Sequence, residues 1–165
     1  MEENFTPDAI DLKLLTLLQD DASQSNQALA ERACVSPPTC LRRVRRLREA
    51  GWIEGVTAIL STDRLAAHLG HGLTVVAEVT LERQNAEALD QFEQLAVTQA
   101  AVQQCYRVTP GPDFVLIVQV PDMPAWNHLA GTVLRADQNV RNVKAYFSVR
   151  RAKFTPKVPI PSEKR

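Results

Sequence analysis

The chain has 165 residues, of which 45% are apolar, so it can bury one hydrophobic core or two small ones. Nineteen basic and nineteen acidic residues cancel, and this balance excludes a protein that binds nucleic acid or membranes through bulk charge alone. A charged partner must therefore be inferred from where the charges lie.

The chain start and the rarer residues give no sign of export, membrane insertion or catalysis. The acidic start MEENFTPD differs from a signal peptide, and no apolar run approaches the roughly 18 residues that span a bilayer. We therefore expect a cytoplasmic protein without a membrane partner. Three cysteines lack zinc-ligand spacing and three histidines fit no catalytic triad, so we expect no catalytic residue, metal or cofactor.

Between residues 8 and 50, apolar residues recur at helical spacing in three segments. The first opens with Thr6 and Pro7, interpreted as the cap and the first helical position. The second follows Ser25 and is too short to be stable alone. A tight turn leads to the third, which Gly51 ends. Three helices with a tight turn before the last are typical of a helix-turn-helix.

The third segment, SPPTCLRRVRRLREAG at 36–51, concentrates five arginines. At 100° per residue, the stripe interpreted as the core side is Leu41, Val44, Leu47 and Arg48. The opposite stripe is Thr39, Arg42, Arg43 and Arg46, with Arg45 at its margin. Because guanidinium groups bind phosphates and guanine, this stripe predicts a face for double-stranded DNA. A solvated charged face is the alternative. Ser36 is expected to cap the helix through the Thr39 N–H, with a helix start after Pro37 as a second option.

The remainder predicts a different architecture. Residues 52–61 suggest a small β-wing or outgoing strand, and residues 61–72 a connection. Strands are then expected at 73–81, 101–109, 113–120 and 143–149, with helices after the first and third of these. The order βαββαβ is the ferredoxin-like arrangement, and its open sheet face favours dimerisation. We expect four parts: a winged helix-turn-helix at 1–56, a linker strand and hinge at 57–72, a ferredoxin-like domain at 73–150, and an extended tail at 151–165.

Three stretches of the sequence carry a family resemblance. They are DAIDLKLLTLLQDDA, NQALAERACVSPPTCLRRVRRLREAGWIEGVTAIL and VQQCYRVTPGPDFVLIV. Over nearly its whole length the chain resembles transcriptional regulators of the Lrp/AsnC (feast/famine) family. The resemblance implies an α+β fold, in which a winged helix-turn-helix precedes a ferredoxin-like, RAM-type domain. It also implies a homodimer that assembles further into an octamer, and an amino-acid effector bound at subunit interfaces.

Carried over by position, the resemblance assigns DNA contacts and an effector loop. The predicted DNA-binding residues are Ser36, Pro38, Thr39, Arg42, Arg43, Arg45 and Arg46. The predicted effector-binding residues are Thr109, Pro110, Gly111 and Asp113. Asp113 is either a turn-forming aspartate or a ligand of the effector's amino group. The loop departs from the family pattern at Pro110 and Pro112, and a threonine common in the last strand is Ala145 here.

Two other functions are compatible with this layout. An architectural DNA-binding protein that needs no effector would use the second domain for assembly alone. Siroheme decarboxylases resemble the same two-domain layout, but they carry histidines between the second and third strands, where this chain has QQCYRVTPGPD. We therefore predict a DNA-binding transcriptional regulator and not an enzyme.

Overall fold

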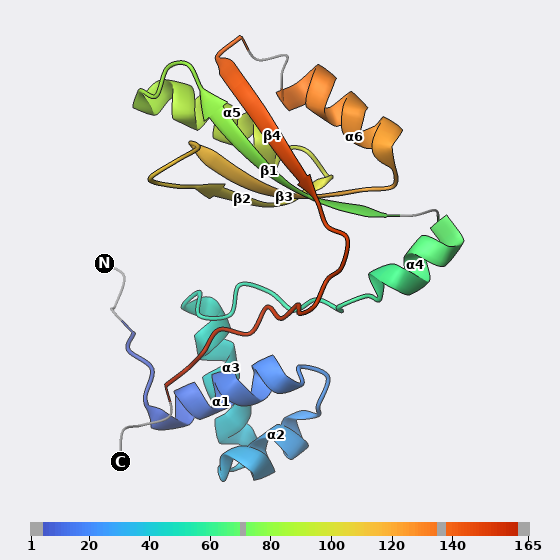
Figure 1. The fold of residues 1–165 in the computed structure, drawn as a ribbon. Helices are drawn as coiled ribbons and strands as arrows, with labels where there is room; N and C mark the ends of the chain where they lie inside the picture. Colours follow the sequence, from blue (N-terminus) through green and yellow to red (C-terminus); the bar gives the residue numbers. More distant parts are fainter. Residues whose placement is uncertain (1–4, 70–71, 135–137, 162–165) are drawn as a thin grey trace. The chain divides into compact units, whose positions relative to one another are not determined.

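The computed structural model describes residues 5–69, 72–134 and 138–161. The chain forms two compact units (Figure 1). Each unit has its own hydrophobic core. The first unit combines both ends of the chain, residues 1–59 and 153–165, and the second comprises residues 60–152. The predicted fold class is confirmed, since a helical unit precedes a four-stranded antiparallel sheet with helices.

Three helices form the framework of the first unit: α1 (Ala9–Asp20), α2 (Asn26–Ala33) and α3 (Pro37–Glu49). The cap of α1 is Asp8 and not Thr6. Asp8 and Asp11 form a capping box, in which each carboxylate accepts a hydrogen bond from the other residue's backbone N–H. All three helices contribute to the buried core, whose members include Leu14, Leu29, Ala30, Cys40 and Leu47.

The turn into α3 is set by Cys34, which adopts a left-handed backbone conformation with φ 60°. The helix begins at Pro37, because the Ser36 carbonyl already accepts the first helical hydrogen bond from Cys40 N at 2.9 Å. The expected side-chain cap is wrong. The Ser36 hydroxyl bonds to the Thr39 hydroxyl at 2.8 Å, and no Ser36 side-chain bond reaches a backbone N–H of α3.

The chain leaves α3 through Gly51, whose φ of +74° suits glycine. Trp52 N donates to Leu47 O at 2.9 Å and closes the helix end. The expected β-wing is wrong, since residues 52–61, all within the described part, form no strand. An extended segment needs a neighbouring strand for stability, and the described strands pair only with one another. The apolar Val56, Ile59 and Leu60 of this segment are exposed.

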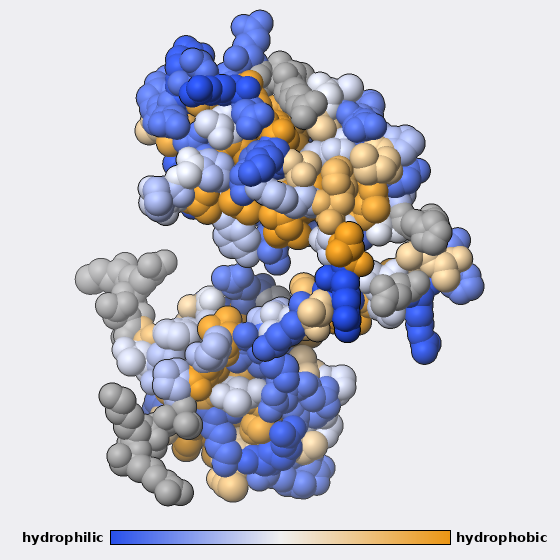
Figure 2. Space-filling view, viewed as in Figure 1, coloured by the Kyte–Doolittle hydropathy of each residue, from blue (hydrophilic) through white to orange (hydrophobic). Residues whose placement is uncertain are grey.

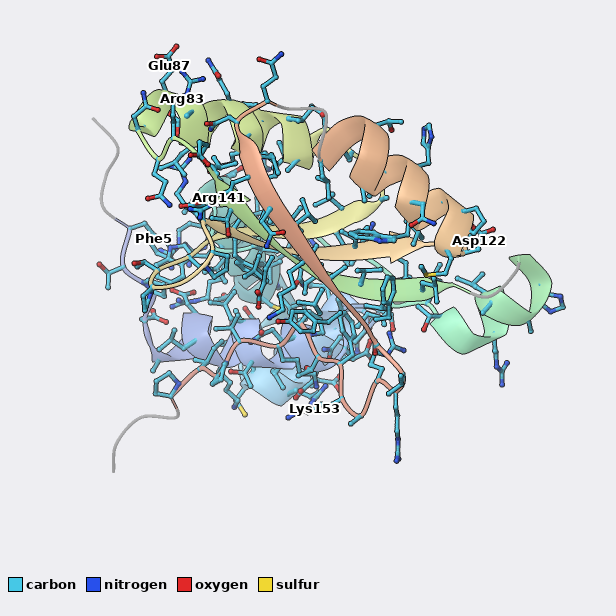
Figure 3. All side chains as sticks on the ribbon, turned by 45° about the horizontal axis from the view of Figure 1, so that its top comes forward. Phe5, Arg83, Glu87, Asp122, Arg141 and Lys153 are labelled. Atoms are coloured by element: carbon cyan, nitrogen blue, oxygen red, sulfur yellow. The ribbon has the colours of Figure 1, made fainter. Side chains whose placement is uncertain are left out.

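The second unit begins with helix α4 (Thr62–Leu69), where the sequence suggested a plain connection. The other elements follow the expected order: β1 (Leu73–Leu81), α5 (Ala86–Val97), β2 (Val102–Arg107), β3 (Phe114–Val120), α6 (Met123–Leu129), a π-helical turn (Ala130–Leu134) and β4 (Val140–Phe147). The sheet order is β2-β3-β1-β4, with all neighbours antiparallel. Asp122 caps α6 by accepting from Ala125 N at 2.8 Å (Figure 3).

One face of the sheet packs against α5 and α6. Alternate residues of β1 and β3 are buried there, and Phe92 of α5 contacts Phe114 with ring centroids 4.8 Å apart. Trp126 of α6 meets Phe147 edge to face at 6.0 Å. On the opposite face, Val115 and Ile117 of β3 are only half-buried. The sheet therefore has one closed face and one open face.

The end of the chain returns to the first unit as an extended tail. The Val158 N–H donates to Oε1 of Gln19 in α1 at 2.6 Å, and Nε2 of Gln19 donates to the Val158 carbonyl oxygen at 3.1 Å. Lys157 pairs with Asp20 at 2.8 Å, and Ile160 packs on the core of the three helices. The helical unit is thus completed by residues from the far end of the sequence.

Candidate nucleic-acid interface

The side chains of helix α3 point in three directions. Cys40, Val44 and Leu47 point into the core, with Cys40 and Leu47 fully buried. Arg43 and Arg46 point toward the start of α1. The outward side chains are Pro38, Leu41, Arg42, Arg45 and Arg48, all of which are exposed. This outward face is the part of α3 that a ligand can reach within the unit.

The core stripe predicted for α3 is wrong at two positions. Leu41 is 60% exposed, and Arg48 is also exposed, whereas Cys40 takes an inward position. The positions 40, 44 and 47 and the positions 41, 44 and 48 both follow helical spacing. Packing against α1 and α2 selects the first set, which rotates the whole helix relative to the expectation.

The same rotation turns Arg43 and Arg46, two of the predicted DNA-binding residues, toward α1, and their contact with DNA stays a prediction. Arg43 is 15% exposed, and its Nη1 lies 2.7 Å from Asp8 Oδ2 and 2.8 Å from Asp11 Oδ1. The Nη2 of Arg46 lies 2.8 Å from Asp11 Oδ2. The Asp11 carboxylate, fully buried, therefore holds both guanidinium groups against α1.

Electrostatics and a ring contact fix this arrangement further. Hydrogen bonds to Asp11, and then to Asp8, raise the pKa of the Arg43 guanidinium. Phe5, just before α1 (Figure 3), places its ring 4.1 Å from the Arg46 guanidinium carbon. Such cation–π contacts stabilise a cation over an aromatic face. These two arginines serve the packing of α3 on α1.

The outward arginines have few protein partners. Arg45 forms an i,i+4 pair with Glu49 at 2.8 Å, but both side chains are highly exposed, so the pair contributes little. Within the described residues, Arg42 and Arg48 form no ion pair. Ser36 and Pro38 are exposed and Thr39 is half-buried at the start of the helix. Five of the seven predicted DNA-binding residues therefore lie outside the salt-bridge network around Asp11.

The predicted effector residues lie together in the loop between β2 and β3. Thr109, Pro110 and Gly111 are exposed, and the Thr109–Pro110 peptide is cis. Asp113 is half-buried: its Oδ2 accepts from Leu81 N at 2.7 Å, and its own N–H donates to Val79 O at 2.9 Å. One oxygen of this carboxylate is thus used to tie the loop to β1.

Comparison with known proteins decides the family. Residues 74–158 match the family model for the Lrp/AsnC ligand binding domain, and residues 7–54 match a winged helix-turn-helix DNA-binding model. The leucine-responsive regulatory proteins of Klebsiella pneumoniae and Escherichia coli K12 are 35% identical over 153 residues, which cover 93% of this chain and 91% of each relative. The chain belongs to the Lrp/AsnC family.

Solved structures of Lrp/AsnC proteins share the fold. A transcriptional regulator of Neisseria meningitidis in complex with L-Met superposes with a TM-score of 0.82 and 29% identity, covering 93% of this chain and 97% of that one. An AsnC family regulator of Agrobacterium tumefaciens gives 0.81 and 26%, with the same coverage. This Lrp/AsnC chain is thus a DNA-binding transcriptional regulator with a ligand-binding domain. Within the described residues, no helix is long and apolar enough to cross a membrane.

Among the features of this Lrp/AsnC chain that its sequence did not lead us to expect, three concern the packing of the helical unit. Asp11 binds two arginines of α3, and an Asp-x-x-Asp pair at the start of α1 is the signal that could have indicated it. Leu41 lies outside the core. The tail packs on the helices, where Ile160 is apolar and follows a lysine that matches Asp20. The Asp-x-x-Asp signal can be read from the sequence, whereas the exposure of Leu41 and the packing of the tail depend on tertiary structure.

Proposed function

We propose that the outward face of α3 binds the major groove of double-stranded DNA in a sequence-specific way. The residues assigned to this contact are Ser36, Pro38, Thr39, Arg42 and Arg45. The observation that carries the proposal is Arg42, which is exposed in the first half of α3 and makes no ion pair within the described chain. The start of a recognition helix is the end that contacts base edges, and arginine binds guanine or phosphate there.

We further propose that the chain acts as a homodimer through the open face of the sheet. Val76, Val115 and Ile117 lie at the centre of that face and are half-buried in a single chain. Tyr106 and Tyr146, on the outer strands, expose about half of their surface. Apolar side chains are also visible among polar ones on the surface of the second unit (Figure 2). The apolar centre of this face favours association. Further assembly to an octamer stays a prediction from the family resemblance.

The ligand is proposed to be an amino acid, bound at subunit interfaces next to the loop at 109–113. Support comes from the match to a ligand-binding family model and from the L-Met complex of the Neisseria relative. The Asp113 Oδ1 atom and the exposed Thr109 would offer acceptors for an amino group. An effector that prefers one assembly would shift the DNA-bound population by that preference alone.

One observation favours the architectural alternative, in which no effector binds. Asp113 already accepts a hydrogen bond from Leu81 N, so the carboxylate has a structural function without a ligand. Calorimetric titration with the twenty amino acids separates the two proposals. Heat from any one of them supports an effector-responsive regulator, whereas a silent panel supports the architectural protein.

DNA recognition is tested by selecting duplexes from a random library with the full chain and then measuring binding of the selected sequence. Arg42→Ala is expected to weaken binding about tenfold or more and to reduce the slope of log K against log salt by about 1 for each phosphate that the variant no longer binds. Arg64→Ala, an exposed arginine of α4, is the matched control. Equal binding by both variants would remove Arg42 from the interface.

A further inference from the structure

Pro38 and Leu41 form an exposed apolar patch on the outward face of α3. They are three residues apart and therefore neighbours on the helix surface. Leu41 exposes 60% of its surface, although the nearby Cys40 and Val44 of the same helix lie in the core. The patch belongs to the first one and a half turns of α3, where a recognition helix approaches the bases.

The surroundings of this patch indicate what it contacts. Arg42 follows Leu41 directly, and Arg45 lies one turn further on the same face. A purely apolar protein partner would leave these guanidinium groups without counter-charges in the interface. The major groove of DNA has the matching combination, since phosphates line its edges and the thymine 5-methyl group is the apolar feature on its floor.

We propose that Leu41, supported by Pro38, contacts a thymine methyl group and thereby fixes a T·A pair at one position of each half-site. This inference rests on the proposed DNA-binding function of α3 and adds a specificity-determining residue to it. The arginines are long and can reach phosphates or guanine from several positions, whereas a leucine must lie directly against its partner. Leu41 therefore discriminates bases by close apolar contact.

Replacing thymine by uracil removes only the methyl group and leaves every hydrogen-bonding atom in place. Burial of one methyl-sized group corresponds to about a fourfold change in affinity, or about 0.8 kcal/mol. We expect uracil to weaken binding of the unmodified protein about fourfold at one thymine per half-site. We expect no such loss for Leu41→Ala, because the methyl group then has no partner to lose.

The experiment uses the duplex selected by the full chain from a random library, with uracil introduced at each thymine in turn. Leu41→Ala and the control Val97→Ala, an exposed apolar residue of α5, are measured on the same set. Alanine is a strong helix former, so the change at position 41 preserves α3. Circular dichroism checks this point.

The outcomes separate the inference from the function on which it rests. The contact is supported if uracil at one thymine weakens binding of the unmodified protein and of Val97→Ala but does not weaken binding of Leu41→Ala. Equal uracil profiles for the unmodified protein and Leu41→Ala, with tight binding retained, overturn the role of Leu41 and leave DNA recognition intact. Failure of the unmodified protein to enrich any duplex overturns the proposed function and the inference together. A loss of dimerisation in Leu41→Ala would assign the patch to a protein interface instead.

Discussion

Asp11 and Arg43 join two helices through a hydrogen-bonded ion pair in which the Asp11 carboxylate is fully buried and lies 2.8 Å from the arginine. Because Arg46 binds the second oxygen of the same carboxylate, α3 is fixed against the start of α1. The arginines of α3 therefore have two separate functions. Arg43 and Arg46 orient the helix, whereas Arg42 and Arg45 remain exposed on its outward face.

Replacing Asp11 by alanine is expected to destabilise the first unit by about 2–3 kcal/mol, because Arg46 loses its carboxylate partner and Arg43 keeps only Asp8. Urea unfolding followed by Trp52 fluorescence, in a Trp126→Phe background, measures the effect. Glu49→Ala removes only the exposed partner of Arg45 and should change stability by less than about 1 kcal/mol. A similar loss in both variants would contradict a special role for the buried carboxylate.

The charge of Asp8 predicts a pH dependence of the same unit. The Asp11 N–H, and then Arg43, lower the pKa of Asp8 below its ordinary value of 3.8. The folded state thus favours the ionised form, so the contribution is fully present above about pH 4 to 5 and is lost as the pH falls through the folded-state pKa. Asp8→Asn keeps a capping oxygen but removes the charge. Its urea midpoint should be lower than that of the unmodified protein at pH 7, and the difference should shrink toward pH 2. A difference in urea midpoint that grows as the pH falls would contradict the predicted pH dependence.

The tail is expected to stabilise the helices on which it lies. Gln19→Ala removes two hydrogen bonds to the Val158 backbone and should lower the free energy of unfolding by about 1–2 kcal/mol. Ile160→Ala should have an effect of about 1 kcal/mol, since this side chain is only partly buried. Hydrogen exchange of α1 peptides reports both effects. Val149→Ala, a fully exposed position, is the control, and exchange rates that match the control in both test variants would show that the tail adds no stability.

The open sheet face predicts the behaviour of a charge placed at its centre. Ile117→Glu should weaken dimerisation about tenfold or more, because the carboxylate would have to be desolvated in the interface. Sedimentation velocity over a concentration series measures the change. Val97→Glu carries the same charge on an exposed site of α5 and should leave association unchanged. An unaltered dimer with glutamate at position 117 would place the interface elsewhere.

The sheet and helix α3 differ in how far the sequence determines which of their side chains are buried. The alternation of Val75, Ala77 and Val79 predicts the buried face of β1 correctly, because a strand has only two faces and one of them is polar or half-buried. Helix α3 offers two overlapping stripes, 40/44/47 and 41/44/48, and periodicity alone does not choose between them. Packing against α1 and α2 makes the choice, and the buried carboxylate of Asp11, distant in the sequence, binds Arg43 and Arg46 in the resulting orientation.

The route of the chain through the first unit has a consequence for its synthesis. Residues 60–152 form a separate unit between the helices and the tail that completes them. At about 5–20 residues per second, a ribosome takes on the order of ten seconds to produce this insertion. During that interval α1 lacks the contacts of Gln19, Asp20 and the core with the tail. The DNA-binding unit therefore reaches its final form only after the ligand-binding unit has been made.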